Sequence, residues 1–381
     1  MIKMDDDSVI YDRSALSSAL MSSAACSVNS WNEWDPLEEV IVGRLDGAVV
    51  PPYHISVTYN RPHSASWLHR LTAGRRYPQW MVLRAQTELD GFVHLLEAEG
   101  VHVRRPEPID QRRRVRTRLW SSRGFCLACP RDLYLVVGDE IIETPTCWRS
   151  RHFEGDAYRT LFKEYFADGA RWTAAPRPQL PDELFDRSYR VPEPGEPVRY
   201  ITNEFEPVFD AADIARCGRD LFITRSNATN EAGTRWLRRH LGDRGLRLHQ
   251  IDSRCSRPMH IDTTFVPLAP GKVLVNPEFI DVDRLPPILK RWDVLIAPRP
   301  DPVDDPMAKF SMCSPWTSIN VLMLDHRRVV VEASQPMLHR ALRDWGFEPL
   351  ALPFLGYGPF GGAFHCATLD TRRHGGLEHY F

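Results

Sequence analysis

A short repeated layout constrains the fold of this 381-residue chain more than any other feature of its sequence. The layout is a polar residue, a β-rich run, a tight turn, a second β-rich run and, in some copies, a helical stretch. Clear copies follow Asp132, Asp262 and Asn320. Unrelated α/β units would not be expected to place a polar residue repeatedly at this point, whereas a ring of similar units would. The repeat therefore favours a ring in which each unit directs one side chain toward a shared axis.

Two weaker copies extend the pattern. Asp210 lies ahead of the β-rich run 220–224, which a helical stretch follows, and Cys366 precedes a final run at 367–370. A comparable run without a partner stands at 38–42, so pairing of the first and last runs would close a fifth unit. The alternative is an open α/β sheet with helices on its two faces.

A helix at 80–99 is the clearest single element. Its apolar residues recur at i, i+3, i+4 and i+7, namely Leu89, Phe92, Val93 and Leu96. Gly100 follows as a stop signal. Residues 50–80 hold four prolines and two Gly/Arg-rich turns, a composition that predicts a long loop.

The composition excludes several classes of protein. The formal net charge of −2 gives no electrostatic basis for general nucleic-acid binding. No apolar run approaches the roughly 20 residues that cross a bilayer. Residues 1–28 are acidic and then Ser/Ala-rich, which predicts a flexible leader without the features of a signal peptide. We therefore expect a cytoplasmic protein whose eight cysteines are reduced.

His260-Ile261-Asp262 is the first candidate for chemistry. Side chains at i and i+2 of a strand share a face, so an extended segment would place His260 beside Asp262 and turn Ile261 into the core. Such a pair suits a general base, two metal ligands or a hydrogen-bonded structural pair. The tripeptide alone favours the structural pair.

Cys366, in the segment Gly361-Gly-Ala-Phe-His-Cys366, is a candidate nucleophile. Two glycines before a thiol permit a tight turn and a close backbone approach. The thiolate would need a histidine from elsewhere as its base, because His365 would point away from Cys366 in an extended segment. The alternative is a buried cysteine that acts as a small apolar residue.

Three aspartates could complete this site, namely Asp132, Asp210 and Asp213. Taken singly, each suits a turn or a helix cap. In a ring they would face the same axis as His260 and Cys366. A thiol, an imidazole and several carboxylates suit a planar cation. Guanidinium fits best, because two carboxylates can hold its N–H groups while the thiolate reaches its carbon.

Metal and nucleotide sites have little support in the sequence. Cys126-x-x-Cys129 lacks a second cysteine pair or a histidine pair at zinc-like spacing, so we expect no metal. No glycine-rich phosphate-binding motif appears, so we expect no nucleotide cofactor. The arginine-rich stretch 112–118 is interpreted as a solvated loop face.

Six segments share their motifs and their order with one known family. They are Trp34-Asp-Pro-Leu-Glu-Glu-Val-Ile-Val-Gly43, Pro130-Arg-Asp132, Glu206-Pro-Val-Phe-Asp-Ala-Ala-Asp213, Met259-His-Ile-Asp262, Asn276-Pro277 and Gly361-Gly-Ala-Phe-His-Cys-Ala-Thr-Leu-Asp370. From about residue 30 to Phe381, the chain resembles the amidinotransferases, which include glycine amidinotransferase and the inosamine-phosphate amidinotransferases of antibiotic pathways. The resemblance implies a five-bladed α/β propeller of pseudo-symmetric ββαβ modules, formed as a single catalytic domain by residues 29–381.

The resemblance also implies a chemistry. The amidino group of L-arginine would pass to a small-molecule amine with release of L-ornithine, without a cofactor, as in natural-product biosynthesis. Carried over to this chain, Cys366 is the nucleophile, His260 the general acid/base and Asp210 the residue that orients the imidazole. Asp132 and Asp262 hold the guanidinium.

Three segments depart from glycine amidinotransferase. Its Asn-Pro-x-Arg segment supplies an arginine for the substrate carboxylate, but here the segment is Asn276-Pro-Glu-Phe279. Its Asn-Pro-Met-His becomes Arg257-Pro-Met-His260, and its Ser-Ser-Lys-Trp becomes Cys313-Ser-Pro-Trp316. We therefore predict an altered substrate pocket, a different arginine for the donor carboxylate, and poor use of glycine. The pocket residues expected from these segments are Arg257, Met259, Phe279, Cys313 and Ser314.

Other functions stay open at this stage. A guanidine hydrolase of the arginine-deiminase type would use the same residues, with water attacking in the second step. A binding protein with a decayed site is disfavoured, because every proposed catalytic residue is intact. The acceptor could be an aminocyclitol, an amino acid or an amine on a polyketide-type intermediate. We expect no nucleic-acid or membrane partner, and a homodimer is allowed.

Overall fold

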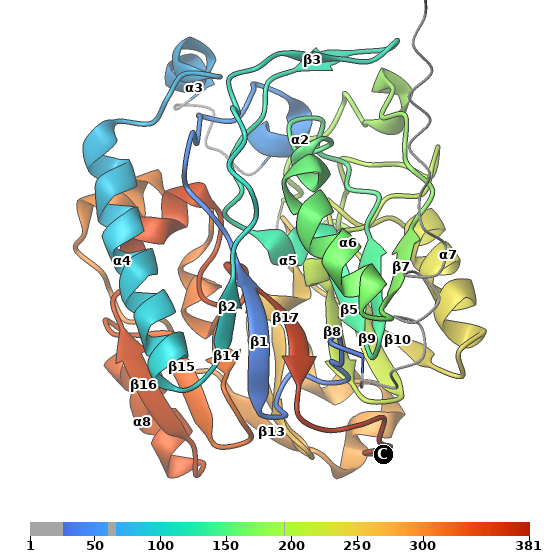
Figure 1. Cartoon of the computed structure of the whole chain (residues 1–381), viewed down its shortest axis with the longest axis vertical. Helices are drawn as coiled ribbons and strands as arrows, with labels where there is room; N and C mark the ends of the chain where they lie inside the picture. Colours follow the sequence, from blue (N-terminus) through green and yellow to red (C-terminus); the bar gives the residue numbers. More distant parts are fainter. Residues whose placement is uncertain (1–25, 60–65, 194) are drawn as a thin grey trace, which may run out of the picture.

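Five three-stranded sheets with one common layout dominate the part of the chain that the structure describes (Figure 1). This computed structural model describes residues 26–59, 66–193 and 195–381. Each sheet combines one antiparallel and one parallel pair of strands. The orders are β17-β1-β2, β5-β6-β7, β10-β9-β8, β11-β12-β13 and β14-β15-β16. The chain is therefore an α/β protein, as the repeat predicted, and none of the described sheets closes on itself.

The strand bounds follow the repeat closely. In the first three sheets the strands are β1 (Leu37–Val42), β2 (His102–Arg104), β5 (Tyr134–Val137), β6 (Glu140–Glu143), β7 (Arg171–Ala174), β8 (Ile214–Cys217), β9 (Asp220–Thr224), β10 (Arg247–Ile251) and β17 (Thr368–Arg373). In the other two they are β11 (Phe265–Ala269), β12 (Lys272–Val275), β13 (Asp293–Ile296), β14 (Leu322–Met323), β15 (Arg328–Glu332) and β16 (Glu348–Leu352). A small hairpin is formed by β3 (Val115–Arg116) and β4 (Ser121–Ser122).

The first sheet joins distant parts of the chain. β1 pairs antiparallel with β17, so Val40 lies opposite Asp370. On its other side β1 runs parallel to β2. The predicted pairing of the first and last β-rich runs is confirmed.

Each parallel pair needs a crossover, because two parallel strands cannot be joined by a tight turn. Helices provide it in four sheets: α4 (Gln79–Ala98), α6 (Arg159–Ala167), α7 (Glu231–Gly242) and α8 (Pro336–Asp344). In the fourth sheet along the chain the crossover instead contains the 3₁₀ turns η6 (Val282–Arg284) and η7 (Pro287–Arg291). The helix predicted at 80–99 is thus confirmed as α4, which buries its apolar side through Leu89, Phe92 and Leu96.

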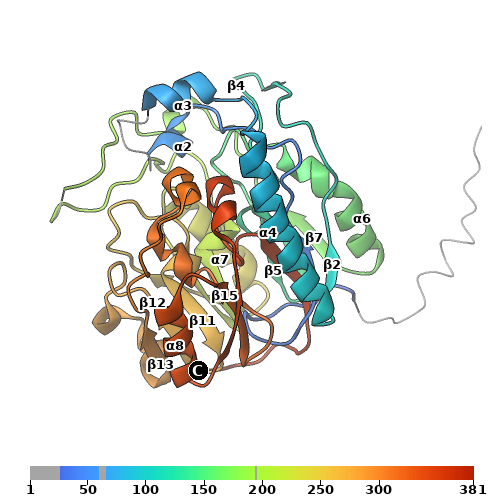
Figure 2. The ribbon, with the colours of Figure 1, turned by 90° about the vertical axis from the view of Figure 1, so that its left-hand side faces the viewer.

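The loop predicted at 50–80 is wrong in part. This stretch contains α2 (Ile55–Thr58), α3 (Ser66–Thr72) and the start of α4, while residues 60–65 lie outside the described ones. The His54 ring accepts a hydrogen bond from the Ser56 backbone and so caps α2. Prolines before these helices do not prevent them, because proline disrupts a helix only in its interior. Together with the β3–β4 hairpin, α2 and α3 lie at the end of the molecule opposite the C-terminus (Figures 1 and 2).

Several of the sheets touch one another. β17 contacts β5, β8 contacts β11, and the Arg373 side chain of β17 donates to the Met323 carbonyl of β14. Polar turns of the repeat also meet one another, since α5 (Pro130–Leu133) contacts η4 (Ala211–Asp213), which contacts η5 (Ile261–Thr263). These turns carry the candidate site.

Of the predicted leader, only residues 26–28 are described, and Val28 among them is fully buried. No helix within the described residues is both long and apolar enough to span a membrane.

Candidate active site

A cavity of about 360 Å³ lies where the polar turns meet. Nine of the ten residues predicted for the site line it: Asp132, Arg257, Met259, His260, Asp262, Phe279, Cys313, Ser314 and Cys366. The tenth, Asp210, is fully buried behind the His260 ring. The sequence therefore located the cavity, although its residues come from segments more than 200 positions apart.

Cys366 follows a turn that requires glycine. Gly361 and Gly362 have φ angles of 106° and 114°, in the region that favours glycine. A Cβ atom on Gly362 would also collide with the Cys366 side chain. Asn320 fixes the turn, because its Oδ1 accepts from the backbone N–H groups of Ala363 and Cys366, both at 3.1 Å. Its Nδ2 lies 3.3 Å from the Cys366 sulfur.

His260 does not lie in a strand. It caps the 3₁₀ turn η5 with a φ angle of 42°, so the prediction that His260 and Asp262 share a strand face is wrong. The two side chains still line one cavity. Their direction is set by the 3₁₀ turn and not by the alternation of a strand. Ile261 is fully buried, as expected.

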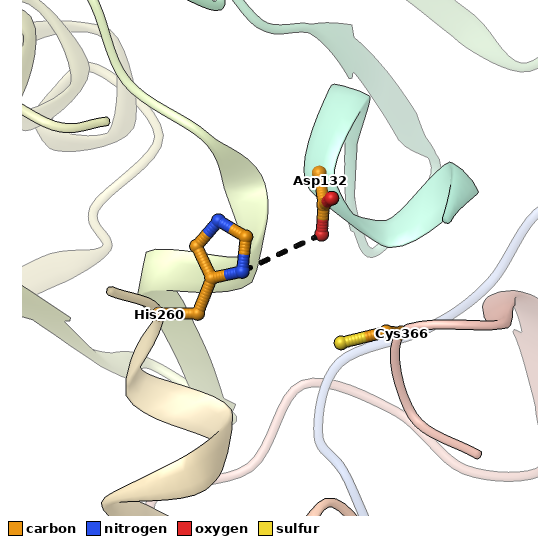
Figure 3. A group of neighbouring side chains, drawn as sticks. All are labelled: Asp132, His260 and Cys366. Carbon is orange, nitrogen blue, oxygen red and sulfur yellow. Dashed lines mark ion pairs between the residues drawn. The ribbon is translucent and has the colours of Figure 1, made fainter. Parts of the chain in front are cut away.

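The His260 ring lies between two carboxylates. Nε2 is 3.3 Å from Asp210 Oδ2, and Nδ1 is 3.7 Å from Asp132 Oδ1. Figure 3 shows this second ion pair, with the Cys366 sulfur directed toward it. The three side chains of Asp132, His260 and Cys366 each present one atom within 4.8 Å of the others. Imidazole, thiol and carboxylate are thus close enough to act on one small group.

Asp262 contacts the Cys366 thiol from another side. Its Oδ2 lies 3.3 Å from the Cys366 sulfur and 2.9 Å from Nδ1 of His365. His365, which the sequence excluded as the base, thus binds a carboxylate of the site. Sequence reasoning missed this contact because it assumed an extended segment.

Two carboxylate oxygens at the cavity accept no hydrogen bond from the described residues, although one of them, Asp132 Oδ1, lies 3.7 Å from His260 Nδ1. Asp132 Oδ1 and Asp262 Oδ1 are buried and have no hydrogen-bond partner within the described parts of the chain. Buried acceptors are usually satisfied, so both oxygens are able to accept from the N–H or O–H groups of a bound molecule. The other oxygen of Asp132 does have a hydrogen-bond partner, because Arg151 binds Oδ2.

Arg151 is a site residue that the sequence reasoning missed. Its guanidinium binds Asp132, lies 3.1 Å from Glu154 through Nε, and donates to the Cys129 carbonyl at 2.7 Å. All of its nitrogens are therefore occupied by the protein. No spacing or motif in the sequence marks this residue.

Buried charges set the protonation of His260 and Cys366. Burial disfavours the charged imidazole of His260, but the carboxylates of Asp132, Asp210 and Asp213 outweigh burial and raise its pKa to about 10. Burial also raises the pKa of the Cys366 thiol well above its ordinary value, and Asp262 adds to the increase. At neutral pH the site therefore holds an imidazolium and a thiol.

The same three side chains are spaced such that they could hold a metal ion. Binding of a metal there would release the protons of the thiol and the imidazolium. The two cysteines of Cys126-x-x-Cys129 are buried and bond to the Phe360 carbonyl.

Comparison with known proteins gives a consistent result. No protein-family model matches the chain. It is 47% identical, over 353 residues, to an L-arginine:L-lysine amidinotransferase of Pseudomonas savastanoi pv. phaseolicola. The aligned region covers 93% of this chain and 96% of that protein. Among solved structures, it resembles SxtG, an amidinotransferase of Microseira wollei in the saxitoxin biosynthetic pathway. The TM-score is 0.90 at 51% identity, over 93% of this chain and 100% of that one. It also resembles the inosamine-phosphate amidinotransferase of Streptomyces griseus, with a TM-score of 0.83 at 38% identity, over 93% of this chain and 99% of that one.

Proposed function

Because the chain belongs to the amidinotransferases, we propose that it moves the amidino group of L-arginine onto an amine through a covalent amidino-Cys366 intermediate and releases L-ornithine. One observation carries this proposal. The open oxygens Asp132 Oδ1 and Asp262 Oδ1 lie on the cavity that also holds the Cys366 sulfur. Two carboxylates can bind the N–H groups of a guanidinium and leave its carbon open to the thiolate.

The first half-reaction begins with the thiol. The cationic guanidinium, once held beside Cys366, favours the thiolate, and the thiol proton leaves to solvent. The thiolate attacks the guanidinium carbon to form an S–C bond. The bond from that carbon to the ornithine nitrogen then breaks, and the imidazolium of His260 gives its proton to the departing amine. The high pKa of His260 matches this task, because the leaving amine is itself strongly basic.

The second half-reaction reverses these steps with a new amine. The neutral His260 takes a proton from the incoming amine as its nitrogen attacks the amidino carbon. The S–C bond breaks, and Cys366 leaves as the thiolate. Asp210 holds the imidazole in position during both halves, since its Oδ2 contacts Nε2.

The arrangement of the five sheets supports this site. We infer that they form the blades of a five-bladed α/β propeller, with the polar turns of the repeat at its centre. The contacts between α5, η4 and η5, and the closing contact from β17 to β14, fit that arrangement. Each blade would then contribute to the site through the polar residue that precedes its hairpin.

The arginine carboxylate needs a cation at the mouth of the site. Arg151 and Arg257 are the arginines that line the cavity within the described residues. Arg151 is fully occupied by protein groups. Arg257 is exposed and forms no ion pair with any described carboxylate, so we assign the carboxylate to Arg257.

The main competing function is hydrolysis of L-arginine by water, as in a deiminase. Both schemes use Cys366, but they differ in the first leaving group as well as in what attacks next. In a deiminase ammonia leaves first and water then releases citrulline, whereas water attacking the amidino-Cys366 intermediate after ornithine has left would release urea. The decisive assay incubates the protein with L-arginine alone and follows ornithine, citrulline and the protein mass. A transferase gives at most one ornithine per protein and an amidino adduct on Cys366 until an amine is added. Continuous citrulline formation without an amine would establish the hydrolase.

The same assay, run with a panel of amines, identifies the acceptor. L-Lysine is the first candidate, because the relative from Pseudomonas savastanoi is named for arginine and lysine. Glycine is expected to be poor, since Arg257, Phe279 and Cys313 alter the pocket beside an intact catalytic set. The loss should be about one to two decades in kcat/KM relative to the best acceptor. Cytoplasmic location and a homodimer stay predictions.

A further inference from the structure

His365 is a buried histidine that the proposed reaction does not use. Its ring lies between two carboxylates, with Nδ1 2.9 Å from Asp262 Oδ2 and Nε2 3.4 Å from Glu33 Oε2. Both nitrogens face acceptors, which suits the doubly protonated ring. Burial and Arg131 oppose that charge, but the two carboxylates outweigh them and raise the pKa of His365.

The Glu33 carboxylate that contacts this ring is itself held in place by other residues. Arg216 binds it twice, through Nε to Oε1 and Nη2 to Oε2, both at 2.8 Å. Burial disfavours the ionised Glu33, but Arg216 outweighs burial and keeps the pKa of this carboxyl well below its usual range. The Glu33 carboxylate is therefore charged and held in one orientation.

The two carboxylate oxygens of Asp262 have different surroundings. Its Oδ2 accepts from His365 and from the Cys366 thiol, whereas its Oδ1 has no partner in the described structure. A carboxylate is planar, so holding one oxygen also fixes the direction of the other. Whatever holds Oδ2 therefore decides where Oδ1 points.

We propose that His365, anchored by Glu33, is a positioning residue that holds Asp262 Oδ2 and so directs Asp262 Oδ1 at the guanidinium of the amidino donor. The inference rests on the proposed function. It differs from a merely structural role, in which His365 would only link buried acids. A structural link affects stability whichever contact is lost, whereas positioning affects donor binding only when the Asp262 contact is lost.

Two substitutions separate the contacts of the ring. Asparagine places its amide nitrogen near the position of Nδ1, so His365→Asn keeps a donor for Asp262. Glutamine places its nitrogen near Nε2, so His365→Gln keeps a donor for Glu33 only. The measurement is the concentration dependence of Cys366 labelling by L-arginine, with the melting temperature recorded for each protein. We expect His365→Gln to raise the half-saturating arginine concentration about tenfold, and His365→Asn to raise it less than about threefold.

A matched control comes from another buried histidine. His339 on α8 is as buried as His365, and its Nε2 lies 2.8 Å from the backbone carbonyl of Glu332. His339→Asn should lower the melting temperature and leave the half-saturating arginine concentration unchanged. Equal effects of His365→Asn and His365→Gln on arginine labelling, in proportion to lost stability, would overturn the positioning role.

A second measurement does not depend on folding of the His365 variants. The structure of Cys366→Ser with bound L-arginine should retain the His365–Asp262 contact and place Asp262 Oδ1 within hydrogen-bond distance of the guanidinium. Rotation of Asp262 away from His365 in that complex would disprove the inference. Failure of the wild-type protein to react with arginine at all would instead reject the proposed function.

Discussion

Two groups of buried charges lie close together and are built in opposite ways. In the network behind the site, every carboxylate oxygen of Glu33 and Asp370 has a partner. Its cations are Arg131, Arg216 and Arg373. In the cavity group, Asp132 and Asp262 each keep one buried oxygen that accepts no hydrogen bond from the described residues.

The two groups differ in whether their hydrogen bonds are complete. A buried ion is tolerated when its hydrogen bonds are complete, and the network behind the site meets this condition. The cavity group does not meet it alone, and the proposed guanidinium, with several N–H donors, would complete it. Asp210 and Asp213 also carry a buried oxygen without a hydrogen bond, so Asp132 and Asp262 are distinguished by their place at the cavity as well.

The largest effect should come from the nucleophile of the cavity group. Wild-type protein incubated with L-arginine should gain one amidino group, and Cys366→Ser should gain none, as measured by intact-protein mass spectrometry. Cys26→Ser is the control, because Cys26 lies outside the cavity and should not affect labelling. An adduct that persists in Cys366→Ser would remove this residue from the mechanism.

Substitutions of His260 and of its partner Asp210 should have the next largest effects. His260→Ala should abolish both ornithine release and labelling of the acceptor, because one imidazole serves both half-reactions. Asp210→Asn should keep the fold and lower the rate by about 10²–10⁴-fold, since an amide holds the ring but does not stabilise the imidazolium. Stopped assays of ornithine with and without an amine measure both. Loss of only one half-reaction in His260→Ala would contradict the shared role.

The same substitution of aspartate by asparagine, made once in each group of buried charges, tests the comparison directly. Asp370→Asn leaves three arginines short of a partner and should lower the free energy of unfolding by about 3–5 kcal/mol. Asp132→Asn should lower stability much less and yet prevent efficient labelling by arginine. Urea unfolding and labelling rates test the pair. The reverse order of effects would mean that unsatisfied acceptors do not mark the functional carboxylates.

Arg257 should show a smaller and substrate-dependent effect. Arg257→Ala should raise the KM for L-arginine by about ten- to a hundredfold, as expected for loss of a charge-assisted contact. Agmatine, which is arginine without its carboxylate, should react equally well with both proteins. If agmatine suffers the same loss as arginine, Arg257 does not bind the carboxylate.

The smallest effect concerns pH and stability. The folded-state pKa of His260, about 10, exceeds its usual value of about 6.5, so its charge stabilises the fold fully below the latter. That contribution is lost progressively as pH rises toward about 10. The difference in melting temperature between wild type and His260→Asn should therefore shrink between about pH 8.5 and 10. This range lies above the pKa values of Asp213 and Glu154, about 7 and 8, so neither carboxyl dominates the change. A constant difference would show that His260 does not carry the charge.

Local patterns predicted those features that depend on neighbours in the sequence. The i, i+3, i+4, i+7 spacing gave α4 to within one residue at each end. The polar residue before each hairpin located Asp132, Asp262 and Cys366 at one cavity. Gly361 and Gly362 were interpreted correctly, because a turn next to a thiol has few alternatives to glycine.

Features that depend on distant partners were not predictable in this way. His260 adopts a positive φ angle that only the surrounding structure can impose, so the strand assumed around it was wrong. Arg151 and Glu33 act through contacts with residues 19 to 332 positions away. Their own neighbours in the sequence give no sign of those contacts.

The pairing of β1 with β17 has a consequence for how the protein is made. A ribosome releases residues 37–42 long before it produces residues 368–373, so β1 must wait without its antiparallel partner for most of synthesis. Contacts across so long a stretch of chain form slowly and late. The nucleophile sits directly before β17, and reactivity would therefore arise only with the last folding step. Partly made chains would carry the binding carboxylates and no means of using them.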